Sequence, residues 1–194
     1  MANANQPSGF RPVCYRSGAP YNGAANRYYK DTTAGVIGIG DIVIRGTNSS
    51  SPDGYPEIVR AAADAAITGV VVGIEPIMTN LSQQGYLLAA DVGYVLVADD
   101  PNLLFEVQEG GSGTSLAVTN IGEHIDSSTP ADADTFIGRS KTVLDNAALA
   151  TGNQWRIEGL VHRADNAVGA YAKWLVSPNL HTEINASATN LTEI

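Results

Sequence analysis

The chain has 194 residues, of which 44% are hydrophobic and 16% charged, with 20 Gly, 9 Pro, a single Cys and a net charge of −9. This length fits one domain with a substantial core, and the scarcity of charged residues disfavours a helix-rich fold. A single Cys excludes an intrachain disulfide, and the negative net charge argues against binding to a nucleic-acid backbone. The sequence contains no apolar stretch long enough to predict a membrane span, and its N-terminus lacks the apolar run of a signal peptide.

Residues 1–30 predict an extended, irregular N-terminal arm. They contain three Pro, three Gly and five aromatic residues without helical or strand periodicity. They also carry four cations and no acid, a charge of +4, which leaves −13 for residues 31–194. Tyr and Arg often anchor interfaces, so the predicted partner-binding residues are Phe10, Arg11, Tyr15, Arg16, Tyr21 and Arg27. The alternative is that the arm folds back over its own body.

The rest of the chain predicts short strands. Eight segments rich in Val, Ile and aromatic residues are bounded by Gly, Asn, Asp and Pro. They are residues 36–46, 65–77, 93–99, 103–109, 115–122, 139–145, 155–163 and 172–177. This spacing predicts an all-β fold, an antiparallel β-barrel or sandwich of about eight short strands. Residues 31–180 are the expected β body and residues 181–194 a C-terminal tail.

Several segments carry more specific expectations. Residues 69–73 are apolar on both faces, which predicts a central, doubly covered strand. Residues 155–163 alternate between apolar and polar side chains, as in a half-buried strand, and Trp155 and Trp174 are expected in the core. The turn at residues 99–102 predicts a tight hairpin between the strands beside it.

Two segments, residues 58–65 and 143–150, have short helical character. Residues 46–57 and 122–135 are expected to be exposed polar loops.

The sequence carries no recognisable catalytic or cofactor motif. The glycine cluster at 35–41 lacks the Lys of a phosphate-binding loop, and the three His have no associated nucleophile motif. The acids at 126–134 fit a solvated loop better than a weak calcium site, and Cys14 has neither a second Cys nor a neighbouring His. We therefore expect no cofactor, no metal and no enzymatic activity, although an unmarked hydrolase site is an open alternative.

Two ends of the sequence resemble tailed-bacteriophage head structural proteins. The opening MANANQPSGFRPV is similar to the pattern M-A-N-x-x-x-P-x-G-F-x-P-V of that group. Residues 155–181 resemble its closing segment, in which a strand ending in Arg, an Asp-Asn-Ala-x-Gly turn and an Ala-Lys-Trp strand recur. Residues 70–77, 95–109 and 116–122 resemble its middle strands, so the likeness covers nearly the whole chain.

This resemblance implies a capsid decoration, or cement, protein. Such a protein is non-enzymatic, is made in the host cytoplasm, binds the outer surface of the capsid and stabilises contacts between major capsid subunits. The implied partners are the major capsid protein and two further copies in a homotrimer, with neither nucleic acid nor membrane. The alternative is a head fibre, tail or receptor- or carbohydrate-binding virion protein, for which the loop at 46–57 supplies only Tyr55 as an aromatic platform.

Overall fold

The computed structural model describes residues 3–47, 51–78, 81, 85–110, 113–129 and 132–184, and these residues form an all-β fold. The strands form a larger sheet of six strands in the order β1-β9-β13-β12-β10-β11 and a smaller sheet of five in the order β2-β8-β6-β4-β5, with a separate pair β3-β7. All strand pairs within these sheets are antiparallel. The predicted fold class is confirmed, in a sandwich-like form without a closed barrel.

The larger sheet consists of β1 (Arg11–Tyr15), β9 (Leu103–Gln108), β10 (His124–Ser127), β11 (Leu144–Leu149), β12 (Trp155–Leu160) and β13 (Lys173–Pro178). The smaller sheet consists of β2 (Asn26–Lys30), β4 (Ile42–Arg45), β5 (Ile58–Arg60), β6 (Gly69–Ile74) and β8 (Gly93–Ala98). The short pair is β3 (Ile37–Gly38) with β7 (Tyr86–Leu87), and a 3₁₀ helix spans Val118–Asn120. No helix among the described residues has the length and apolar character that a membrane crossing requires.

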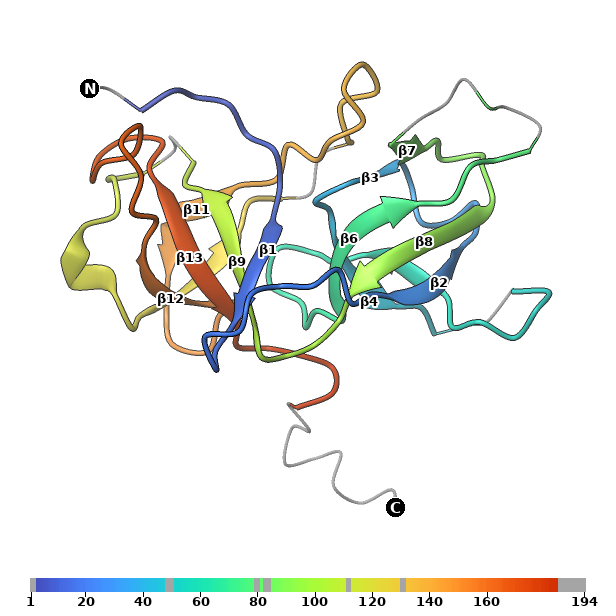
Figure 1. Cartoon of the computed structure of the whole chain (residues 1–194), viewed down its shortest axis with the longest axis horizontal. Coiled ribbons are helices and arrows are strands. Elements are labelled where there is room, and N and C mark those ends of the chain that lie inside the picture. Colours follow the sequence, from blue (N-terminus) through green and yellow to red (C-terminus); the bar gives the residue numbers. More distant parts are fainter. Residues whose placement is uncertain are drawn as a thin grey trace.

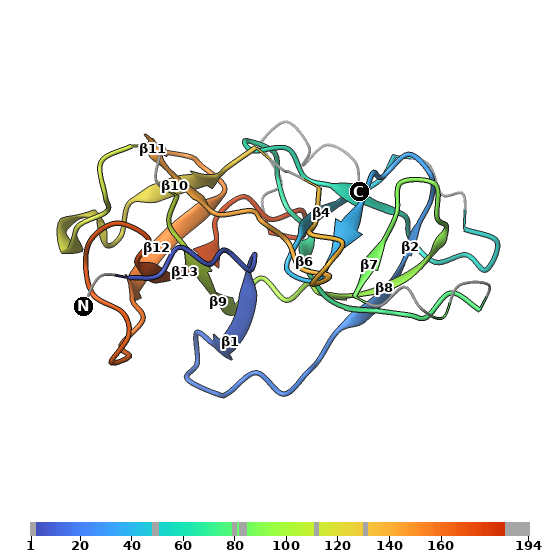
Figure 2. The same cartoon turned by 90° about the horizontal axis from the view of Figure 1, so that it is seen from above.

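The chain passes between the two sheets more than once. Figures 1 and 2 show the sheets side by side, with β1 and β9 in one and β2 and β8 in the other. The predicted hairpin between residues 93–99 and 103–109 is therefore wrong, because β8 and β9 belong to different sheets. The turn itself forms as expected: the Asn102 N–H donates to Asp100 Oδ1 at 2.7 Å.

Strand β6 lies in the centre of the smaller sheet and is covered on both faces. Val70 belongs to a core cluster that also contains side chains of the larger sheet, whereas Val71 belongs to a second cluster with Val95 and Val97. Both Val70 and Val71 are fully buried. The prediction of a central strand at residues 69–73 is confirmed, and its first three residues are buried while the next two are half-buried.

The larger core is built around Trp155, which is fully buried. The ring of Phe10 stacks on it with centroids 4.4 Å apart, and Phe105 meets it edge-on at 5.5 Å. Trp174 is also fully buried, so both Trp residues lie in the core as predicted. Along β12, Ile157 is buried and Arg156 is exposed, which agrees with the predicted alternation.

The first 30 residues are not an irregular arm, because they supply one strand to each sheet. Strand β1 pairs with β9, with Arg11 opposite Glu106, and β2 pairs with β8 from Asn26 to Lys30. Phe10 and Tyr28 are each only 2% exposed. The alternative interpretation, in which this segment folds back over its own body, describes the structure.

Other local predictions are corrected by long-range pairing. The helices expected at 58–65 and 143–150 are absent, and these segments contain strands β5 and β11 instead. The segment 115–122, expected to be a strand, contains the 3₁₀ helix instead. Of the strand expected at 139–145, only the last two residues belong to a strand, because β11 begins at Leu144. The loop expected at 122–135 contains β10, which pairs with β11 and β12. Of the predicted tail, residues 185–194 lie outside the described residues.

Candidate interaction surface

The predicted partner-binding residues make intramolecular contacts, most extensively Phe10 and Arg27. Phe10 is part of the core, as described above. The Arg27 guanidinium donates to both carboxylate oxygens of Glu75, at 2.6 and 2.7 Å, and lies 3.6 Å from the ring centroid of Tyr94. Tyr55 adds a second ring at 4.7 Å from the same guanidinium. These contacts hold the pKa of Arg27 above its usual value, chiefly through the hydrogen bond to Glu75.

The other cations of residues 1–30 are also paired within the chain. Arg11 contacts Glu106 at 3.2 Å and Arg16 contacts Glu158 at 3.0 Å. Lys30 is fully buried, and its ammonium donates to the carbonyl oxygens of Asp31 and Asp91 at 2.8 Å. The positive charge predicted to attract a partner is thus largely balanced by intramolecular contacts.

The two tyrosines of the predicted set, Tyr15 and Tyr21, are half-buried against the larger core, and the Tyr21 hydroxyl donates to the Ala24 carbonyl at 3.0 Å. Of the six predicted residues, only Arg11 and Arg16 have strongly exposed side chains, at 63% and 44%. The structure therefore does not gather the six residues into one accessible surface.

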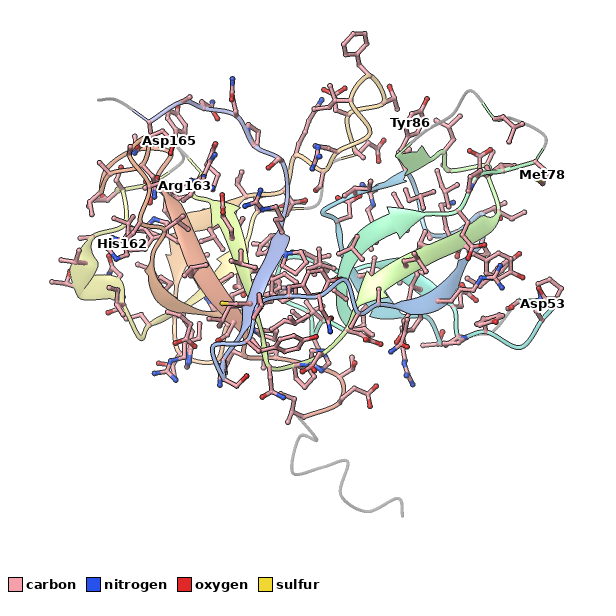
Figure 3. The ribbon with its side chains drawn as sticks, in the orientation of Figure 1. Asp53, Met78, Tyr86, His162, Arg163 and Asp165 are labelled. Atoms are coloured by element: carbon pink, nitrogen blue, oxygen red, sulfur yellow. The ribbon has the colours of Figure 1, made fainter. Side chains whose placement is uncertain are left out.

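More than half of the exposed large apolar side chains of the described residues lie instead on loops along one side of the molecule, which we call the loop end. It comprises the described residues of 3–9, 78–92, 132–141 and 163–170, which lie along the upper side of Figure 1. Seven of the twelve large hydrophobic side chains exposed among the described residues lie here: Met78, Leu81, Leu88, Val92, Phe136, Ile137 and Val168. In Figure 3 Met78 lies at the upper right beside the smaller sheet and Asp165 at the upper left above the larger sheet, so the loop end extends across both sheets.

Backbone and side-chain hydrogen bonds attach the loops of this end to neighbouring segments. The Ile39 N–H donates to the carbonyl oxygens of both Gly85 and Gly138, at 3.3 and 3.1 Å. On the other side, the Asn3 side chain donates to the Ala167 carbonyl at 2.8 Å and accepts from the Ala167 N–H at 3.0 Å. Each loop of the loop end is therefore attached, through at least one described residue, to a neighbouring segment.

A groove runs between the N-terminal segment and the loop at 134–141. It has a volume of about 590 Å³, and Pro7 and Ile137 contribute apolar atoms to its walls. Lys141 and Lys173 place two cations along it, beside a single acid, Asp134. A second, smaller groove adjoins it through Lys173 and Ser8 and contains Arg11, Glu106 and Arg163.

Two buried carboxyl groups have raised pKa values, and both have structural partners. Asp41 is 2% exposed and accepts the Gly38 N–H at 2.8 Å, and its burial raises its pKa to about 6. Glu109 is fully buried and accepts from the Leu116 N–H at 2.9 Å and from Trp174 Nε1 at 3.2 Å, and burial raises its pKa as well.

The acids at 126–134 that were weighed as a calcium site bind separate partners. Asp126 accepts the Gln154 N–H at 2.9 Å, Asp132 contacts Arg60 at 3.0 Å, and Asp134 contacts Lys141 at 3.2 Å. Across the described part of the chain, no group of three or more His, Cys, Asp or Glu side chains is arranged to hold a metal ion. Cys14 is a half-buried free thiol on β1.

Comparison with known proteins finds no matching family model, curated protein or solved structure.

Sequence patterns missed an adjacent pair of exposed apolar residues in the loop end, Phe136 and Ile137, of which Phe136 is the most exposed large hydrophobic residue among the described ones. The predicted polar loop stopped at residue 135, one residue before them. The available signal was a pair of adjacent apolar residues between Asp134 and Gly138, in a stretch otherwise made of Asp, Ala, Thr and Pro. An apolar pair at a turn rich in Asp and Gly is typical of an exposed tip that serves an interface.

Proposed function

We propose that this chain is a non-enzymatic virion structural protein that binds the outer surface of a phage capsid and stabilises contacts between major capsid subunits. The observation that carries the proposal is the loop end, where seven exposed apolar side chains lie on loops that hydrogen bonds attach to neighbouring segments. A set of exposed apolar side chains of this kind marks a protein-binding surface. The class of partner follows from the resemblance of the sequence to phage head proteins.

The way these loops are held supports a binding role. Association costs free energy whenever loops and side chains must become ordered. Here Asn3, Gly85 and Gly138 already make hydrogen bonds that fix the loops to their surroundings. The part of this cost that comes from ordering the loops is therefore smaller for this surface.

A homotrimer would increase the strength of attachment. Docking of one copy places the loop ends of the other two at high effective concentration, so the trimer gains affinity without new contacts. The net charge of −9 also fits a protein whose remaining surface faces solvent, because like charges limit association between decorated particles.

The loop at 46–57 gives little support to the alternative of a fibre or receptor-binding protein. The ring of Tyr55 packs edge-on against Tyr94 at 5.7 Å, and both rings lie against Arg27. The Tyr94 hydroxyl in turn donates to Asp53. This aromatic cluster is engaged in internal contacts, whereas a sugar platform requires a free ring face.

The test is binding to undecorated heads assembled from the major capsid protein encoded with this chain. Purified protein is mixed with the heads, free protein is removed by sedimentation, and bound copies are counted against shell subunits. We expect saturable binding in a fixed ratio to shell subunits and greater resistance of the heads to heat. Absence of binding, or a few copies confined to one vertex, would contradict the proposal.

A further inference from the structure

We propose that Phe136 is the anchor of the loop end, and that it inserts into an apolar pocket bordered by carboxylates on the partner subunit. This inference rests on the proposed function, because the partner meant is the shell subunit to which the protein binds. It adds the residue that makes the central contact and the chemistry of the surface that receives it.

The loop that carries Phe136 is held in one conformation by hydrogen bonds around Asp134. The Phe136 N–H donates to Asp134 Oδ1 at 2.9 Å, and the Gly138 N–H donates to the Asp134 carbonyl at 2.7 Å. Lys141 contacts the other carboxylate oxygen at 3.2 Å. The bond from the Phe136 N–H and the contact with Lys141 hold the pKa of Asp134 below its usual value, so the carboxylate that organises the loop is ionised at neutral pH.

The base of the loop is closed on itself and attached to Ile39, which directly follows β3 of the short β3-β7 pair. The Asp134 N–H donates to the Arg139 carbonyl at 2.8 Å, and the Ser140 N–H donates to the Ile39 carbonyl at 2.9 Å. Between these attachments the side chain of Phe136 is 96% exposed and that of Ile137 is 55% exposed. A fixed loop that presents an aromatic ring to solvent has the form of an interface anchor, since a buried ring contributes a large apolar area with few rotatable bonds.

The charge beside the loop indicates the character of the receiving surface. The two adjoining grooves are lined by four cations, Arg11, Lys141, Arg163 and Lys173, and by two acids, Glu106 and Asp134. Three of these cations are paired with acids: Arg11 and Arg163 contact Glu106, Lys141 contacts Asp134, and Arg163 also contacts Asp165 at 3.4 Å. Lys173 has no ionic or hydrogen-bonding partner for its ammonium among the described residues. Lys173 therefore gives these grooves an excess of positive charge on a chain whose net charge is −9, and this excess complements a carboxylate on a partner.

The distribution of lysine reinforces this point. The sequence has only three Lys, and the third, Lys30, is fully buried in the smaller sheet. Both Lys residues that solvent can reach therefore line the groove next to Phe136.

A second copy of this chain is a poorer partner for Phe136. The chain has an apolar pocket of about 210 Å³, with Phe10, Pro12 and Tyr21 among its lining residues, but Arg11 and Arg139 lie at the same pocket. Docking Phe136 of one copy there would bring the unpaired Lys173 of that copy toward Arg11 and Arg139 of the other, and not toward an excess of carboxylates. The charges therefore favour an acidic partner of a different kind over self-association through this loop.

The experiment measures binding of four full-length variants to undecorated heads, at low and at physiological salt. Phe136→Ser removes the ring, and Val118→Ser is its control, since Val118 is 60% exposed on the 3₁₀ helix outside the loop end. Lys173→Gln removes a groove cation, and Arg156→Gln is its control on the exposed face of β12. Thermal unfolding of each variant verifies that it is folded.

We expect Phe136→Ser to weaken binding by roughly 30-fold or more, as for the loss of an aromatic anchor, while Val118→Ser binds as the parent chain does. We expect Lys173→Gln to weaken binding several-fold and to reduce its dependence on salt, with no such change for Arg156→Gln. Binding of Phe136→Ser within threefold of the parent overturns the inference and leaves the proposed function intact. Failure of the parent chain itself to bind heads overturns both the proposed function and the inference. A change of oligomeric state in Phe136→Ser without a loss of head binding overturns the inference alone.

Discussion

Replacement of Phe10 by Ala tests whether the N-terminal segment is part of the folded core. Phe10 is 2% exposed, and its ring stacks on Trp155 at 4.4 Å. Truncation of a buried Phe to Ala costs about 3–5 kcal/mol, through lost transfer free energy and the cavity that remains. Since a domain is typically stable by about 5–15 kcal/mol, we expect Phe10→Ala to lose a large part of its stability and to unfold roughly 6–20 °C lower.

The assay is urea unfolding followed by Trp fluorescence, because Trp155 lies in direct contact with the altered site. The urea concentration at the midpoint of unfolding should fall, while the slope of the free energy of unfolding against urea concentration stays the same. This combination identifies a change in the stability of the native state. Phe136→Ala is the matched control: it is the same chemical change at a side chain that is 96% exposed, and we expect it to alter stability by less than about 0.5 kcal/mol. A loss below about 1 kcal/mol for Phe10→Ala would refute the assignment of this residue to the core.

Further predictions concern a buried acid and the N-terminal segment. Burial raises the pKa of Asp41 from 3.8 to about 6, so the folded state holds a proton on this carboxyl more tightly than the unfolded state does. The stability that this difference provides is complete below pH 3.8. It falls by about 3 kcal/mol as the pH rises through about 6. Asp41→Asn should remove this pH dependence and make the chain more stable at pH 7, which unfolding measurements from pH 3.5 to 7.5 would show. The control is Asp64→Asn, at an exposed position. If the free energy of unfolding varied with pH in the same way for both variants, the prediction would be contradicted. Deletion of residues 2–30 should abolish folding, because it removes two strands, whereas deletion of residues 2–9 should leave a folded chain with weaker head binding. A native circular dichroism spectrum after the longer deletion would contradict the strand assignment.

Those parts of the fold that local pattern determines could be predicted from the sequence. The doubly apolar run at 69–73 identified the central strand, and the alternation from Trp155 to Val161 identified a half-buried one. In both cases the burial of a side chain follows from its own type and that of its near neighbours. The conformation of the turn at 99–102 was likewise determined by short-range hydrogen bonds of Asp100.

Pairing between distant strands explains what the sequence could not reveal. The Ala-rich segment 143–150 has helical character by composition, but Leu144 and Leu149 lie opposite Ser127 and Ile125 in a sheet. Residues 11–15 show no strand periodicity of their own and are extended because β9 pairs with them. Propensity is a weak guide at such positions, since tertiary contacts override it.

The candidate surface was misplaced for a related reason. Composition identified Arg and Tyr in the first 30 residues as interface anchors, but it could not show that Glu75, Glu106 and Glu158 lie where they pair with Arg27, Arg11 and Arg16. Those acids lie 48 to 142 residues away along the sequence. The cations of the segment therefore serve the fold, and the exposed apolar side chains of the loop end become the better candidates for partner contact.

The most direct test of the account is a cryo-electron microscopy reconstruction of heads saturated with this protein. We predict density for the two-sheet body on the outer surface of the shell, with residues 132–141 facing the shell and Phe136 within an apolar pocket of a major capsid subunit. A reconstruction without the protein on the outer surface, or with the loop end pointing into solvent, would contradict it.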